Sequence, residues 1–294
     1  MLNNIIPYSF YLLFCLTPPF WTSFNYELFE YNKMILTYAI TIFIIGAWIY
    51  KSIEEKAFIF KRTPLDIPLL LFLGANILST IFSMDVHTSI WGYYSRSNGG
   101  LLSIISYLLL YFAFVSNMNF DNVKTLLRFG LASGFLISTW AILEHFGVSF
   151  SCVLLRGQFN DSCWVQDVAA RVFASLGQPN WLAAYLAMLI FPALYFYLTV
   201  KTKFESIIYY LLTITCYLAF TFTYSRGPSL GLIGGMGIFL LLILRSHLSS
   251  GKLIVKLLLI ILGSFLVINI LFGSALTSFR LISKFAAPAR PAIN

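Results

Sequence analysis

Long stretches without a charged residue constrain this chain more than any other feature of its sequence. A helix needs about 20 apolar residues to cross the hydrocarbon core of a bilayer. Such runs predict an all-α, polytopic transmembrane helix bundle of about nine spans. Pro18-Pro19 should end or kink the first span, because proline lacks the N–H that a helix interior needs. The charge-free runs lie at residues 1–26, 34–50, 67–84, 97–120, 129–143, 172–200, 206–225, 227–244 and 257–279.

The overall composition excludes the main alternatives. Hydrophobic residues make up 59% of the 294 residues and charged residues only 10%, whereas a soluble domain has about 25% charged residues. A disordered chain would have few aromatic residues, and this one has 29 phenylalanines. The net charge of +8 is interpreted as membrane topology, so no nucleic-acid partner is expected. The four cysteines have no metal-ligand spacing, so no metal site and no cofactor is predicted.

The distribution of Lys and Arg orients the predicted spans. Alternate connections, beginning with residues 51–64, carry eleven basic residues, and the opposite connections carry five. Because basic residues accumulate on the cytoplasmic side, this split predicts a cytoplasmic N-terminus. The connections near Arg96, Arg171 and Arg226 then face outward, which in a bacterium means the outer face of the inner (plasma) membrane.

The pattern of spans predicts one integral membrane domain over residues 1–294. The longest segment outside the spans is an outer loop at residues 147–178, which is too long for a simple turn. Cys152 and Cys163 lie in this loop. In an oxidising compartment they could form a disulfide, and the sequence leaves this pairing open.

Arg226 is the most informative of the outer arginines, because the positive-inside bias works against it. It lies between two spans with almost no connecting loop, and Pro228 suits the first turn of the helix that follows. A guanidinium beside a helix N-terminus is a good cradle for a diphosphate. The alternative is an arginine that only anchors a tight turn at the membrane interface.

Two other outer segments combine an arginine with aromatic or amide side chains. Asn180 and Trp181 follow Arg171 at the mouth of the sixth span, where Asn180 either contributes to a site or caps the helix. Trp91 lies five residues before Arg96, in a segment that suits either an aromatic belt or a sugar-binding surface.

Five outer residues could accept a proton: Glu144 and His145 at the end of the fifth span, His87 in an outer loop, and Asp161 and Asp167 in the loop at 147–178. Each is a weak candidate for a general base, since a lone interfacial residue of this kind often only ends a helix. No phosphate-binding glycine loop is present, so nucleotide hydrolysis is not expected.

Three blocks together resemble the bacterial O-antigen ligase and O-antigen polymerase superfamily. They extend from Ser79 to Leu244 in their usual order, and residues 200–294 resemble an incomplete ligase-related region. The first block is Ser79-Thr80-Ile81-Phe82-Ser83, Ser89-Ile90-Trp91-Gly92, Arg96 and Gly100-Leu101-Leu102. The second is Arg171-Val172-Phe173 with Gly177-Gln178-Pro179-Asn180-Trp181-Leu182-Ala183-Ala184-Tyr185, and the third is Thr223-Tyr224-Ser225-Arg226-Gly227.

This resemblance implies metal-independent, inverting transfer of a glycan from an undecaprenyl-diphosphate carrier. The acceptor would be a hydroxyl of a glycan, of lipid A-core or of a protein, in the biosynthesis of cell-surface polysaccharide or lipopolysaccharide. Arg171 and Arg226, with Arg96 as a weaker match, would bind the diphosphate. Trp91, Asn180 and Trp181 would contact the sugar.

The chain departs from the family in one respect. A large outer loop with a catalytic His follows in the family, and no His occurs after Phe279 here. The expectations, in order, are a C-terminally truncated chain, a degenerate member, or a replacement base at His87 or His145. The rival functions are a polysaccharide exporter or flippase and an inactive truncated family member.

Overall fold

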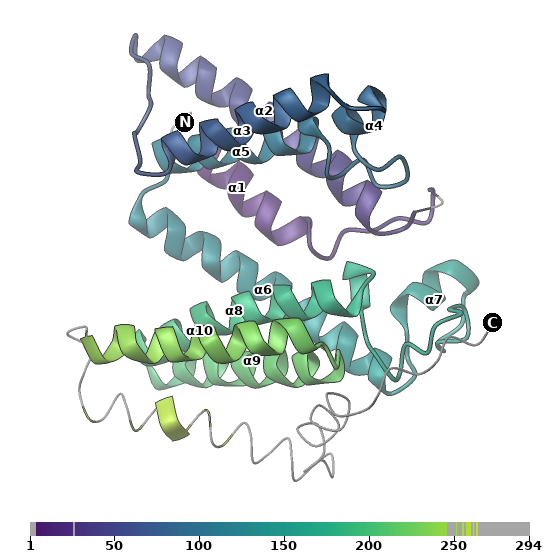
Figure 1. Cartoon of the computed structure of the whole chain (residues 1–294). Helices are drawn as coiled ribbons and strands as arrows, with labels where there is room; N and C mark the ends of the chain where they lie inside the picture. The colour runs from purple at the N-terminus through teal and green to yellow at the C-terminus, as the bar shows by residue number, and fades with distance from the viewer. Residues whose placement is uncertain are drawn as a thin grey trace. The chain divides into compact units, whose positions relative to one another are not determined.

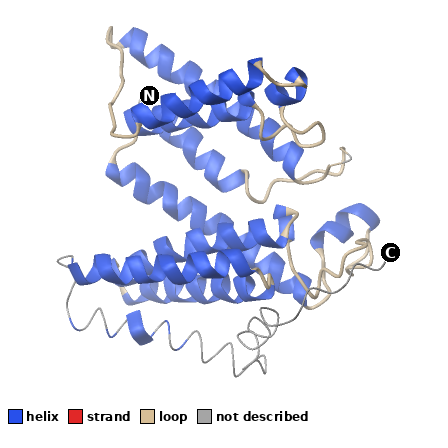
Figure 2. Ribbon diagram, in the orientation of Figure 1, coloured by secondary structure: helices blue, strands red, loops and turns tan. Residues whose placement is uncertain are grey.

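The computed structural model describes residues 4–25 and 27–245, together with positions 251, 255, 257–259, 261 and 263. Every regular element within these residues is helical (Figure 2), which confirms the all-α class for this part of the chain. Five of the helices are long and apolar enough to cross a membrane. The count of nine spans stays a prediction, and most of the run at 257–279 lies outside the described residues.

The chain divides into two compact units, one built mainly from residues 1–133 and the other mainly from residues 134–294. Residues 175–177 belong to the first unit. The division leaves the prediction of a single integral membrane domain untested. Both units are drawn in Figure 1.

The first unit packs apolar helices around a small core. Ile6 and Phe10 of the first helix belong to one buried cluster with Ile44 and Trp48 of the second and with Ala113. All five side chains are less than a tenth exposed. The helices are α1 (Ile5–Leu16), α2 (Glu30–Glu54), α3 (Asp66–Ile81), α4 (Val86–Trp91) and α5 (Leu101–Asn117), followed by the first half of α6 (Phe120–His145).

The first helix ends at Leu16, and its C-cap residue Thr17 immediately precedes Pro18-Pro19, so the predicted break is confirmed. Helix α6 differs from its charge-free run at 129–143 because it begins at Phe120. The side chain of Asn119 accepts a hydrogen bond from the Asn122 N–H at 2.8 Å. This bond caps the N-terminus of α6 about ten residues before the charge-free run at 129–143 begins.

The second unit is centred on α8 (Pro179–Thr199), which packs against both α9 (Lys203–Phe222) and α10 (Arg226–Arg245) (Figure 1). Leu182, Leu186, Ile190 and Leu194 of α8 are almost fully buried. Their four-residue spacing places them on one helix face. The helix begins at Pro179 rather than at residue 172 of the charge-free run, so the predicted outer loop at 147–178 ends where α8 starts.

Candidate functional site

Arg171 is held in the second unit by segments that are distant in sequence. Its Nε donates to the carbonyl oxygen of Thr223 at 3.2 Å, and its Nη2 donates to Oδ1 of Asn180 at 3.4 Å. The backbone N–H of Val172 donates to the carbonyl of Phe222 at 3.3 Å. These bonds join the segment around Arg171 to the end of α9 and to the first turn of α8.

The turn between α9 and α10 carries the second arginine. Tyr224 adopts a positive φ of 48°, which reverses the chain within a few residues, and Arg226 is the first residue of α10. Three residues span at most about 11 Å, so the Cα atom of Arg226 lies within that distance of the Cα atom of Thr223. Because Thr223 accepts the bond from Arg171, the structure brings the Arg171 and Arg226 segments together.

Two arginines and two helix N-termini lie at this end of the second unit. Both guanidinium side chains are exposed, and the N-termini of α8 and α10 lie beside them. A helix N-terminus presents N–H groups without partners in the helix and carries about half a positive charge. Two guanidinium groups beside two helix N-termini are chemically suited to an anion such as the predicted diphosphate.

Glu144 lies beneath this segment and is fully buried. Its Oε2 accepts the backbone N–H groups of Phe173 at 3.2 Å and Ala174 at 2.8 Å. Its Oε1 accepts the Trp140 indole N–H at 3.1 Å and the Ser149 hydroxyl at 3.3 Å. The four donors together engage both oxygens of the carboxyl group. Glu144 therefore fixes the backbone just after Arg171, and its burial disfavours the predicted role as a general base.

His145, the next residue, contacts the same segments. Its Nδ1 lies 2.8 Å from the Ala169 carbonyl oxygen, and its ring stacks on Phe222 with centroids 3.8 Å apart. A carbonyl can only accept, so Nδ1 is the donor in this contact and Nε2 is the ring nitrogen that could act as a base. His145 is therefore the better base candidate of the two adjacent residues.

The loop at residues 147–178 contains a disulfide between Cys152 and Cys163, whose Cα atoms are 5.5 Å apart. Trp164, next to this disulfide, donates its indole N–H to Ser151 Oγ at 3.0 Å. Its ring meets Phe173 edge-on at 5.2 Å. Through Trp164, the disulfide-bonded segment therefore packs against Phe173, whose backbone N–H is bound by Glu144.

Arg96 belongs to the first unit and has a different environment. Its Nε forms an ion pair with Glu30 at 3.2 Å, and Asn98 donates to the other oxygen of that carboxylate at 3.0 Å. Gly92, at φ +84°, allows the loop to close, because a Cβ there would lie 2.3 Å from the Asn98 carbonyl oxygen. An anion would compete with Glu30 for Arg96, so Arg96 is the weakest of the three predicted diphosphate ligands.

The remaining predicted residues divide between the two units. His87 and Trp91 are exposed on α4 of the first unit, with ring centroids 6.4 Å apart. Asn180 is the second residue of α8, and Gln178 occupies the N-cap. Asn180 therefore orients Arg171 rather than capping the helix. Trp181 follows it and is 38% exposed.

Sequence reasoning did not identify the positioning residues. No sequence motif identifies Trp164, Ser149 or the backbone N–H groups that bind Glu144. The only signal in the sequence is a charged residue, Glu144, at the end of an apolar run. Comparison of the chain with family models, curated proteins and solved structures yields no match.

Proposed function

We propose that the chain acts at the outer face of a bacterial inner membrane, with its N-terminus in the cytoplasm, and binds an undecaprenyl-diphosphate-linked glycan. The reaction is transfer of the glycan to an acceptor hydroxyl, as in the O-antigen ligase superfamily that the sequence resembles. The acceptor oxygen attacks the anomeric carbon, the bond from that carbon to the diphosphate oxygen breaks, and undecaprenyl diphosphate leaves.

The observation that carries this proposal is the position of Arg171. It is bonded to the Thr223 carbonyl, three residues before Arg226. Breaking the glycosidic bond transfers negative charge to the diphosphate, and fixed positive groups stabilise such charge most effectively when they are oriented before the reaction. Arginine suits this task because its planar group donates to two phosphate oxygens at once. Asn180 and Trp181 lie on the adjacent turn of α8, where they would contact the sugar.

Two further observations support the proposal. The disulfide between Cys152 and Cys163 favours an oxidising compartment, which agrees with the outward orientation predicted for this loop. Nε2 of the neutral His145 ring can take the proton of the acceptor hydroxyl, and the departing diphosphate needs no proton because the arginines stabilise its charge.

The experiment measures binding and transfer separately. Purified protein in nanodiscs is titrated with undecaprenyl-diphosphate glycan, and transfer to an acceptor polysaccharide is followed in parallel. We expect Arg171→Ala and Arg226→Ala each to weaken binding at least tenfold, since each removes a charge-assisted contact worth about 1.5–3 kcal/mol.

Arg245→Ala is the matched control, because Arg245 ends the same helix that Arg226 begins and should not affect binding. Equal binding by all three variants and the wild type would refute the arginine site. Movement of the lipid-linked glycan across the bilayer without transfer would instead indicate the exporter or flippase function.

A further inference from the structure

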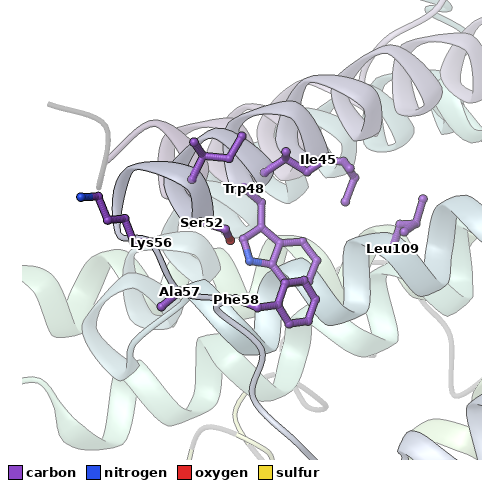
Figure 3. A pocket seen from close by; sticks show the side chains of 9 residues that line it. Ile45, Trp48, Ser52, Lys56, Ala57, Phe58 and Leu109 are labelled. Atoms are coloured by element: carbon purple, nitrogen blue, oxygen red, sulfur yellow. The ribbon is translucent and has the colours of Figure 1, made fainter.

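A groove at the C-terminal end of α2 lies within the first unit and outside the arginine site (Figure 3). Its volume is about 470 Å³, which is in the range of ligand pockets, about 300–1,000 Å³. The walls include Trp48 of α2, Phe58 of the segment that follows and Leu109 of α5. Apart from Ser52 and Lys56, the lining residues are apolar.

The inner wall of the groove, formed by Trp48, is held in place by the protein itself. Trp48 is only 8% exposed, and its indole N–H donates to the Ile59 carbonyl at 2.8 Å. The Phe58 ring stacks on Trp48 with centroids 6.3 Å apart and planes 24° apart. A ligand therefore enters a formed groove and does not have to order its walls, which favours binding.

Lys56 occupies an unusual backbone position at the mouth of the groove. The Ala57 N–H donates to the Ser52 carbonyl at 3.2 Å, and the Lys56 N–H donates to the Ile53 carbonyl at 3.1 Å. This pattern is a Schellman motif, whose left-handed position is usually glycine. Lys56 has a φ of +49° there, so this position carries a lysine side chain at a conformational cost.

The side chain of Lys56 is exposed and forms no hydrogen bond or ion pair with the described residues. Figure 3 shows its ammonium group at the rim, pointing away from the apolar side chains. The nearby Lys51 is already engaged, with Glu55 at 3.9 Å and Asn117 at 3.3 Å. Lys56 is therefore the cation that the groove offers to a ligand.

We propose that this groove binds a glycerophospholipid of the surrounding membrane. One acyl chain lies against Trp48, Phe58 and Leu109, and the phosphate contacts Lys56. Helix α2 is long and apolar enough to span a bilayer, so its end lies near the level of the lipid phosphates. Phe58, 80% exposed, lines the opening with apolar surface that suits an acyl chain.

The phosphate, rather than a net negative headgroup, is the recognised group. Glu54 and Glu55 lie on the same turn and offset the charges of Lys51 and Lys56. The charges within this turn therefore balance, and Lys56 is the lysine left for the phosphate that all glycerophospholipids share.

Lys56→Gly removes the ammonium group and keeps the backbone conformation that ends α2. Glycine suits the left-handed position, so the thermal midpoint should stay the same or rise. The protein is purified from membranes in mild detergent, and retained phosphatidylethanolamine and phosphatidylglycerol are counted by native mass spectrometry. We expect the wild type to retain at least one phospholipid and Lys56→Gly to reduce that occupancy at least fivefold.

Two further variants complete the test. Leu109→Trp fills the groove without changing Lys56 and should also reduce retention, whereas Lys61→Ala, a nearby basic residue that does not line the groove, should not. Wild-type retention in both groove variants, or an equal loss in Lys61→Ala, would overturn the proposal. Displacement of the lipid by millimolar inorganic phosphate would likewise refute the acyl contact.

Discussion

The two units each present an exposed arginine on a loop, and the two arginines are held by opposite kinds of partner. Arg96 of the first unit pairs with the carboxylate of Glu30 at 3.2 Å. Arg171 of the second unit donates to a backbone carbonyl and a side-chain amide. Neutral acceptors orient a guanidinium without cancelling its charge, whereas a carboxylate orients it and neutralises it. Arg171 therefore keeps a positive charge that an anion can bind, whereas the charge of Arg96 is already paired with Glu30.

The placement of the carboxylates explains this difference. In the first unit, Glu30 reaches the guanidinium itself. In the second unit, Glu144 is buried and bonds the backbone N–H groups of Phe173 and Ala174. It positions the segment that carries Arg171 but leaves the Arg171 side chain to neutral acceptors.

The largest expected effect comes from removing the buried carboxylate. Glu144→Ala leaves two backbone N–H groups, an indole N–H and a hydroxyl without their acceptor. Each unsatisfied buried donor costs about 1–3 kcal/mol, and partial relaxation should leave a loss of at least about 3 kcal/mol in the free energy of unfolding. Denaturant titration in detergent measures it. Glu55→Ala, on an exposed turn, is the control, and a Glu144→Ala loss below about 1 kcal/mol would contradict the positioning role.

The next effect comes from making Arg171 resemble Arg96. Asn180→Asp places a carboxylate where Arg171 now donates to an amide, so it should neutralise the guanidinium and repel the diphosphate. We expect affinity for undecaprenyl-diphosphate glycan to fall about tenfold, which corresponds to about 1.4 kcal/mol. Asn180→Ala removes the amide without adding charge and should have a smaller effect. Equal losses in both variants would show that charge is not what matters at this position.

The smallest effect is expected in the first unit. Glu30→Gln releases Arg96 from an ion pair whose side chains are 46% and 19% exposed. Such pairs contribute about 0–1 kcal/mol, so the free energy of unfolding should fall by no more than about 1 kcal/mol. Affinity for the lipid-linked donor should stay within about threefold of the wild type. A tenfold change in donor affinity would instead make Arg96 part of the binding site.

Local features of the sequence were interpreted most successfully. The prolines after Thr17 predict the end of α1, because proline acts on the backbone of its own segment. The start of α8 at Pro179 was not predicted, since the charge-free run extends back to residue 172. Helix α6 was predicted too short because charged side chains were treated as helix boundaries, whereas the Asn119 cap lies further upstream. The roles of Glu144 and Trp164 were missed because their partners lie on other segments.

The sequence alone determines that this chain forms apolar helices, because uncharged runs of about 20 residues suit a bilayer and helices satisfy their own backbone hydrogen bonds there. It also determines which segments carry arginine between those helices. Only the tertiary structure decides what those arginines can do. Whether a guanidinium meets a carboxylate or a carbonyl depends on residues 52 positions away for Arg171, and hydrogen-bond partners at that range are chosen by packing rather than by local sequence.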